Sequence, residues 1–128
     1  MKGNPTGEGR IIYGDGSVYE GEFVNGNAEG YGILTFNDYT RYEGNWYKGK
    51  YHGQGVFSRP NRAKYSGNFV NGKFHGVGEF VWPEGSIYRG EWQNCREHGN
   101  GKFVGSSGTI YEGEWENGRY HGKGRLTT

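Results

Sequence analysis

Rings and glycines alternate with polar residues along most of the chain. Tyr42, Gly44 and Trp46, for example, are separated by Glu43 and Asn45. Because successive side chains of a β-strand point to opposite faces, this alternation predicts a strand with rings and glycine on one face. Helices are not expected in a chain so rich in glycine, which is a poor helix former.

A second alternating run follows the first one, and residues 53–58 are an example of it. Gly53, Gly55 and Phe57 occupy every second position here, so the three are predicted to share a face. We expect this to be the ring-bearing face, because a ring from one strand can lie over a glycine of the neighbouring strand. Burying an aromatic side chain removes about 150–250 Å² from water, which outweighs the ~0.5–1 kcal/mol that a strand glycine costs.

Two kinds of turn signal separate these runs. The first kind lies within each unit, at Asn25-Gly26, Lys48-Gly49, Asn71-Gly72 and Asn117-Gly118. Asn-Gly is the strongest short hairpin signal, since a type I′ turn needs positive φ at both central residues. The second kind leads into the next unit, at Asp15-Gly16, Glu84-Gly85 and Ser107-Gly108, with weaker versions at Asp38-Tyr39 and Asn61-Arg62. The sequence therefore predicts β-hairpins that continue as a meander of roughly eleven strands.

The pattern repeats every 23 residues without an insertion. Tyr-x-Gly-x-aromatic begins at Tyr19, Tyr42, Tyr65, Tyr88 and Tyr111. Repeats of this length are typical of architectures in which each unit packs only on its neighbours. We expect a single domain over residues 1–128, made of a partial unit (1–18), four full units (19–41, 42–64, 65–87 and 88–110) and a near-complete unit (111–128). The predicted fold class is all-β, an elongated, twisted, single antiparallel sheet.

Composition excludes several classes of protein. The 128 residues include 27 Gly, 4 Trp, 11 Tyr and 7 Phe, and the net charge is +1. Abundant rings and a low net charge argue against disorder, and the low net charge also argues against a nucleic-acid-binding protein. No apolar run approaches the roughly 18 residues of a membrane span, and residues 1–5 begin no apolar stretch, so no signal peptide is expected. The single cysteine, Cys95, fits the reducing cytosol.

A column of histidines invites comparison with a metal site. His52, His75, His98 and His121 recur at the same place in successive units. Copies two strands apart lie about 9–10 Å from one another, whereas the ligands of one zinc ion lie within ~4 Å of each other. We expect no metal here and predict instead a hydrogen-bonding role near the turn.

Two further patterns resemble catalytic motifs without their geometry. The Gly-x-Gly pairs are followed by no helix, although a phosphate-binding glycine loop uses a helix N-terminus. The pairs Glu20/Glu22 and Glu112/Glu114 alternate with rings and glycines, so they are expected to face solvent, and no nucleophile and base stand beside them. No enzyme activity and no cofactor are therefore expected.

The segment from 111 to 124 closely resembles the MORN repeat (membrane occupation and recognition nexus). It reads Tyr-Glu-Gly-Glu-Trp-Glu-Asn-Gly-Arg-Tyr-His-Gly-Lys-Gly, and the resemblance extends over nearly the whole chain. The resemblance implies a sheet of stacked hairpins that serves as a scaffold in cytoskeletal, ciliary, flagellar, axonemal or membrane-proximal assemblies. Some members are linked to phospholipid binding, and others are accessory domains of lipid kinases or methyltransferases. The chain departs from the pattern at Glu29, Ser66, Asn68 and Cys95, and we interpret Cys95 as a turn substitution rather than a reactive thiol.

The leading functional hypothesis is a groove that binds a protein partner on the ring-bearing face. A single sheet has nothing of its own to cover that face, and large exposed apolar surfaces usually mark interaction sites. Arg59 and Gly105 interrupt the column that otherwise holds Tyr13, Phe36 and Trp82, which would make the groove selective. The occupant would be an amphipathic helix or an extended segment. The predicted groove residues are Tyr19, Phe23, Phe36, Tyr42, Trp46, Phe57, Tyr65, Phe69, Phe80, Trp82, Tyr88, Trp92, Tyr111 and Trp115.

The alternative is a peripheral membrane adaptor that binds anionic phospholipids through a basic rim. Each cation near an anionic membrane surface can add about 1 kcal/mol to binding. The candidate residues recur close to the two-residue turns, at Lys48, Lys50, Lys73, Arg96 and Arg119. A third hypothesis, an accessory module of an enzyme, requires a catalytic partner chain. Open strand edges at both ends of the sheet could add end-to-end contacts, and a cytoplasmic location, at the cytoskeleton or a cilium, is expected.

Overall fold

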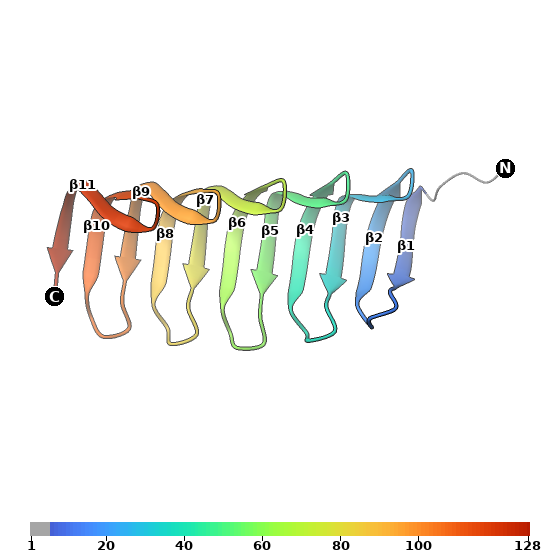
Figure 1. The fold of residues 1–128 in the computed structure, drawn as a ribbon, viewed down its shortest axis with the longest axis horizontal. Coiled ribbons are helices and arrows are strands. Elements are labelled where there is room, and N and C mark those ends of the chain that lie inside the picture. Colours follow the sequence, from blue (N-terminus) through green and yellow to red (C-terminus); the bar gives the residue numbers. More distant parts are fainter. Residues whose placement is uncertain (1–5) are drawn as a thin grey trace.

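The protein is one open antiparallel sheet of eleven strands that pair in chain order (Figure 1). The structure, a computed structural model, describes residues 6–128. The all-β single sheet predicted from the sequence is confirmed, while residues 1–5, which bear on the signal peptide and the start of the partial unit, lie outside the described residues. The strands are β1 Gly7–Ile12, β2 Val18–Val24, β3 Asn27–Thr35, β4 Arg41–Tyr47, β5 Lys50–Ser58, β6 Lys64–Val70, β7 Lys73–Val81, β8 Ile87–Gln93, β9 Arg96–Val104, β10 Ile110–Glu116 and β11 Arg119–Thr127.

The two kinds of predicted turn lie on opposite edges of the sheet. Two-residue turns line the upper edge in Figure 1 and longer loops line the lower edge. At the upper edge both central residues have positive φ, for example 50° at Asn71 and 84° at Gly72, as a type I′ turn requires. At the lower edge the two weaker signals form turns too, with positive φ at Tyr39 and Arg62 instead of at glycine. Both turn predictions are confirmed.

The tyrosine of each unit lies across a pair of glycines that face each other between strands. Gly44 in β4 pairs with Gly55 in β5, and a Cβ atom on either residue would overlap the Tyr42 hydroxyl. The same arrangement recurs in the other units, so the predicted packing of rings on bare backbone is confirmed. The Tyr42 hydroxyl donates a hydrogen bond to the Asn45 carbonyl at 2.6 Å, which holds the ring in this orientation.

A bulge in the second strand of each unit corrects one prediction. Gly44 pairs with Gly55 but Trp46 pairs with Tyr51, so β5 has two more residues than β4 between these pairs. A Cβ on Gly53 would point at the Asn45 side chain, 3.5 Å from its Cβ, and therefore toward the polar face. The prediction that Gly53 shares a face with Gly55 is wrong, because the bulge reverses the alternation.

One further ring lies on the ring-bearing face, in the strand that carries the bulge. Tyr51 stacks on Tyr42 with ring centroids 3.9 Å apart and planes 11° from parallel. The equivalent residues in other units are Ala28, Phe74, Glu97 and Tyr120. Alternation already places Tyr51 on the same face as Gly55, but the column also holds Ala28 and Glu97, and the sequence analysis did not identify it as part of the core.

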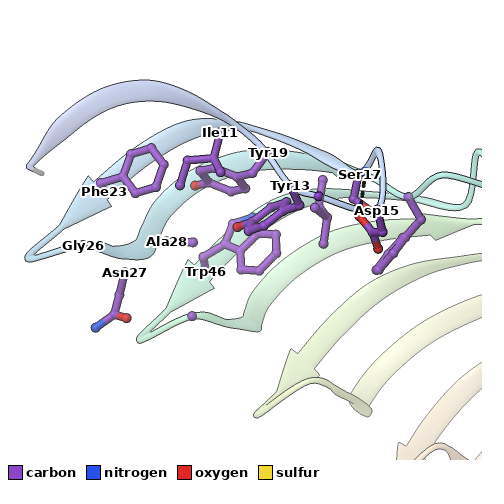
Figure 2. A pocket seen from close by; sticks show the side chains of 14 residues that line it. Ile11, Tyr13, Asp15, Ser17, Tyr19, Phe23, Gly26, Asn27, Ala28 and Trp46 are labelled. Atoms are coloured by element: carbon purple, nitrogen blue, oxygen red, sulfur yellow. Dashed lines mark hydrogen bonds between the residues drawn. The ribbon is translucent and has the colours of Figure 1, made fainter.

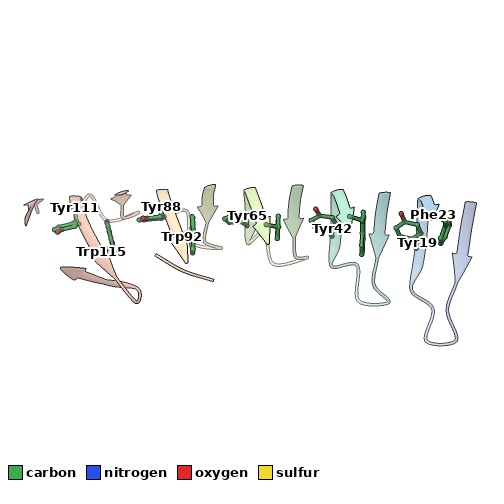
Figure 3. Packing of buried hydrophobic residues seen from close by; sticks show 10 residues of the cluster. Tyr19, Phe23, Tyr42, Tyr65, Tyr88, Trp92, Tyr111 and Trp115 are labelled. Carbon is green, nitrogen blue, oxygen red and sulfur yellow. The ribbon is translucent and has the colours of Figure 1, made fainter. Parts of the chain in front are cut away.

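The core is a row of rings that runs along the sheet instead of between two layers (Figure 3). Within a unit, Tyr42 meets the edge of Trp46 at 5.2 Å, and it meets Phe69 of the next unit at 5.1 Å, both nearly perpendicular. Edge-to-face pairs of this kind add about 0.5–1.5 kcal/mol to the effect of burial. Each unit therefore depends on its neighbour for part of its core.

The upper edge is held together by backbone hydrogen bonds between successive units. In each case the second residue of a two-residue turn donates its N–H to a backbone carbonyl oxygen of the preceding unit. The acceptor is the second residue of the bulged strand in that unit. These bonds are Gly49 to Ala28, Gly72 to Tyr51, Cys95 to Phe74 and Gly118 to Glu97, all between 2.8 and 3.0 Å. Successive hairpins are thereby fixed in register along this edge.

Gly78→Ala tests the packing of rings on glycine. A Cβ at Gly78 would overlap the Tyr65 ring and hydroxyl, so we expect the free energy of unfolding to fall by ~2–3 kcal/mol. Gly14→Ala is the matched control, because a Cβ there would meet nothing within 4 Å. Urea unfolding followed by circular dichroism measures both variants, and equal midpoints would contradict this packing.

Cys95→Gly tests the turn that departs from the repeat. Cys95 has a φ of 67°, where the other units have glycine. A residue with a Cβ atom in this left-handed region costs the folded state about 1–2 kcal/mol. Glycine avoids this cost but has more conformational entropy in the unfolded chain, which offsets part of the gain in stability. We expect Cys95→Gly to exceed Cys95→Ala in stability by ~0.5–1 kcal/mol. Both variants lose the Cys95 sulfur, which accepts a hydrogen bond from the Phe74 N–H, so this comparison of thermal midpoints isolates the backbone, and a more stable alanine variant would refute the explanation.

Candidate functional site: the ring-bearing face

The candidate site is the face of the sheet that carries the rings. All strands of residues 6–128 belong to one sheet, so within this part of the chain no second layer lies over the face. Figure 3 shows a tyrosine beside a phenylalanine or tryptophan recurring on this face, for example Tyr19 with Phe23 and Tyr88 with Trp92. The face therefore has a packed aromatic core, and the side chains that lie over this core are accessible to solvent.

Ten of the fourteen predicted groove residues form the floor of this face. Their side chains are at most 7% exposed, because the rings cover one another along the row. The sequence analysis treated them as contact residues, whereas the structure uses them to support the surface. They are Tyr19, Phe23, Tyr42, Trp46, Tyr65, Phe69, Tyr88, Trp92, Tyr111 and Trp115.

The other four predicted residues lie nearer the surface. Phe36, Phe57, Phe80 and Trp82 are half-buried, and the last three pack against the buried rings. Phe80 and Trp82 contact each other with ring centroids 4.8 Å apart. Half-buried residues that the sequence analysis did not include join them on the face, namely Ile11, Leu34, Tyr51, Phe74 and Phe103.

Several hollows interrupt the face along its length. One of about 510 Å³ lies in the 19–41 unit, between Ile11, Ala28 and Trp46 (Figure 2). A second of about 220 Å³ lies between Phe57 and Trp82, and a third of about 400 Å³ is lined by residues that include Trp82, Glu97, Phe103, Trp115 and Tyr120. The face is therefore uneven, and its units are not equivalent as binding surfaces.

Arg59 and Glu97 add charge to this mainly apolar face. The Arg59 guanidinium lies 5.6 Å from the centre of the Phe57 ring, and Arg59 lines the second hollow. Glu97 occupies the position of the stacked ring in its unit, and burial raises the pKa of its carboxyl group. These two residues make the charge of the face differ from one unit to another.

The predicted basic rim lies along the two-residue turns. Its five side chains are exposed, and none of them forms an ion pair with another residue in the range 6–128. They are Lys48, Lys50, Lys73, Arg96 and Arg119. The Lys48 ammonium lies 5.3 Å from the centre of the Tyr47 ring, so this edge offers separate cations rather than one dense patch.

The histidine column has the hydrogen-bonding role that was predicted, at least in two units. The Nδ1 atoms of His52 and His75 accept from the backbone N–H groups of Asn71 and Asn94, both at 3.4 Å. Thr6 occupies the same place in the first unit and accepts from Asn25. In the last units the pattern changes, since the His121 Nδ1 atom lies 3.1 Å from the Glu116 carboxylate and the buried His98 Nδ1 atom has no hydrogen-bond partner among residues 6–128.

The carboxylate pairs lie where the alternation placed them. Glu20, Glu22, Glu112 and Glu114 are all exposed. A search of the described residues finds no group of three His, Cys, Asp or Glu side chains that could hold a metal ion. In the same part of the chain, no helix is both long and apolar enough to cross a membrane.

Comparison with known proteins gives a family match. The family model described as the MORN repeat matches residues 1–18, 19–41, 42–64, 65–87, 88–110 and 111–128. A search of curated proteins returned no match to the chain. MORN repeats are in general modules that bind proteins or membranes.

Alkaline pH tests the burial of the tyrosine row. Burial raises the pKa of Tyr19 and of Tyr51 to about 12, from an ordinary value near 10. Since these hydroxyls ionise more readily in the unfolded chain, the stability they contribute is complete below pH 10 and is lost as the pH rises toward 12. We expect the urea midpoint to fall over this window. Absorbance at 295 nm records tyrosine ionisation in parallel, and ionisation of all tyrosines near pH 10 with the strands intact would contradict the burial.

Proposed function

The chain belongs to the MORN-repeat family, and from this premise we propose that it is a non-enzymatic scaffold that binds a protein partner on its ring-bearing face. The partner would present an amphipathic helix or an extended segment. The proposal includes a cytoplasmic setting in a cytoskeletal, ciliary or membrane-proximal assembly.

One observation carries the proposal. Apolar side chains such as Phe57, Phe80 and Trp82 are half-buried on a face over which residues 6–128 place no second layer. Contiguous apolar side chains on the surface of a protein usually mark an interaction site. The buried rings beneath it give a rigid base, which lowers the entropy lost when a partner binds.

The variation among units supports selective binding. Arg59 stands in the column of Phe36 and Trp82, and Gly105 removes the side chain altogether in the next unit. An apolar segment that fits over Phe80 and Trp82 would therefore meet a cation on one side and bare backbone on the other. Such differences favour one register of the partner over others.

The membrane is the second candidate, supported by the basic rim. Lys50 and Lys73 are exposed and without ion pairs among the described residues. Cations on one edge could contact anionic headgroups, and this contact would weaken as salt screens it.

Matched variants distinguish the two candidates. Phe57→Ser combined with Trp82→Ser removes two half-buried rings and leaves the ten buried rings in place. Lys50→Glu combined with Lys73→Glu reverses two rim charges. Val77→Ser is the control, because Val77 is 68% exposed and lies in β7 on the face opposite Phe80. Circular dichroism checks that each variant is folded.

Two assays measure the outcome. Crosslinking in extract from the native source identifies the partner, and sedimentation with phosphatidylserine vesicles measures membrane binding. We expect the ring variant to lose at least about 90% of the partner signal, which corresponds to ~1.4 kcal/mol or more, and the rim variant and Val77→Ser to keep it at high salt. Partner binding that survives the ring variant would refute the proposal, and salt-sensitive vesicle binding lost only in the rim variant would favour the membrane.

A further inference from the structure

The column of stacked rings holds a carboxylate in one unit. Three units have a ring at this place, for example Tyr51 stacked on Tyr42, but the 88–110 unit has Glu97. The Glu97 side chain is partly exposed, and no ion pair within residues 6–128 involves it. The ring-bearing face therefore presents an anion without a counter-charge in one unit.

Glu97 lines a hollow of about 400 Å³ whose other walls are mainly aromatic. Trp82 and Phe103 are partly exposed there and Tyr120 is 49% exposed, whereas Trp115 is buried and lies deeper. The ring centroids are 5.7 Å apart for Trp82 and Phe103, 6.4 Å for Phe103 and Trp115, and 5.0 Å for Trp115 and Tyr120. We call this hollow, in which accessible rings surround one carboxylate, the Glu97 pocket.

We propose that the Glu97 pocket binds the guanidinium group of an arginine side chain on a partner polypeptide. The guanidinium would pair with the Glu97 carboxylate and lie against the accessible rings of Trp82, Phe103 and Tyr120. This inference rests on the proposed function, since it assumes a polypeptide on the ring-bearing face, and it adds the charge and chemistry of one contact.

The carboxylate and the rings favour a cation for separate reasons. Burial among the rings raises the pKa of the Glu97 carboxyl group, because its charged form loses hydration there. A cation that donates hydrogen bonds to the carboxylate compensates for this loss, and such charge-assisted bonds are stronger than neutral ones. Aromatic faces also attract a cation that lies within about 6 Å of the ring centre. A neutral or acidic side chain would gain neither contribution.

The chain already places a guanidinium on an equivalent ring. Phe57 and Phe103 occupy the same column, two units apart, and the Arg59 guanidinium lies 5.6 Å from the centre of the Phe57 ring. The residue that stands to Phe103 as Arg59 stands to Phe57 is Gly105, which has no side chain. The 88–110 unit thus has no cation of its own in this column, and a partner would supply it.

The shape of the cation distinguishes arginine from lysine. A guanidinium is planar and weakly hydrated, so it can stack on a ring while it donates two hydrogen bonds to one carboxylate. The ammonium of lysine is a compact, strongly hydrated point charge that cannot stack in this way. A pocket that combines rings with a single carboxylate therefore fits arginine better.

One cation of the chain stands at the edge of the pocket. Among the described residues, Arg119 is the only charged side chain besides Glu97 that lines it. Arg119 is exposed and forms no ion pair with Glu97 or with another residue in the range 6–128. As a like charge it would repel an incoming cation, and salt would screen this repulsion.

Titration with n-propylguanidinium, the side-chain analogue of arginine, tests the pocket directly. In ¹H–¹⁵N spectra of the full chain at constant ionic strength, we expect saturable shifts of the indole N–H signals of Trp82 and Trp115. The indole signal of Trp46, which lies outside the pocket, should stay unchanged. The neutral isostere n-propylurea should cause no saturable shift at the same concentrations.

Matched variants identify the group that binds. Glu97→Gln removes the charge and keeps the shape, so we expect the affinity for n-propylguanidinium to fall at least about tenfold. Glu112→Gln is the control, because Glu112 is an exposed carboxylate in β10 on the face opposite the rings. Glu97→Tyr introduces the ring that other units have and should abolish binding with the fold intact. Arg119→Gln should strengthen binding at low salt.

The outcomes separate this inference from the proposed function. Saturable binding that Glu97→Gln weakens and Glu112→Gln leaves unchanged supports the pocket. Binding that persists in Glu97→Gln, or that n-propylurea or the lysine analogue n-butylammonium equals, overturns it.

The crosslinking assay tests whether the partner uses the pocket. Glu97→Gln should lower the partner signal relative to Glu112→Gln, and equal signals would overturn the inference. If n-propylguanidinium fails to bind while the Phe57/Trp82 double variant still loses the partner, the pocket is refuted and the scaffold proposal stands.

Discussion

The structure depends on one contact, the tyrosine ring laid across a facing pair of glycines. Gly44 and Gly55 are paired and carry no side chains, so the backbone of both strands is uncovered there. The Tyr42 side chain occupies the space that a Cβ atom on either glycine would need. The hydroxyl reaches the Asn45 carbonyl, so the polar end of the ring is satisfied although the side chain is buried. The upper surface of the ring then becomes the platform on which Tyr51 stacks.

This contact explains how a single sheet can hold a core without a second layer. Sheets usually bury one face against another sheet or against helices. Here the rings lie along the sheet and cover each other, so that Tyr42, Tyr65 and Tyr88 have no exposed surface. Since each ring row is completed by the next unit, stability comes from the array and not from one hairpin. The same arrangement leaves the half-buried rings that lie over this row in contact with solvent.

The sequence was sufficient to predict the fold but only part of the site. Alternation, the turn signals and the 23-residue period identified the hairpins, their order and the packing of rings on glycine. The bulge at Gly53 was missed because a strict period of two cannot reveal an inserted pair of residues. The column of Ala28 and Tyr51 escaped notice for another reason, because Ala28 and Glu97 interrupt its run of rings. Whether a ring such as Tyr65 or Phe57 is covered depends on the tilt of its neighbours, which no pattern within one strand encodes.

The division between constant and variable columns gives the chain its means of specificity. Tyrosine and the facing glycines recur in every unit from 19 to 128, and a Cβ atom on either glycine would overlap the tyrosine or the facing backbone. The columns of Ala28 and Phe36 vary instead, and they lie above this base on the ring-bearing face. Substitution in these columns alters the shape and charge of the face at one unit while the hydrogen-bonded ladder stays in place. A repeat array can thereby place a small side chain or a cation at a chosen distance along the sheet, as Ala28 and Arg59 illustrate, without a change of fold.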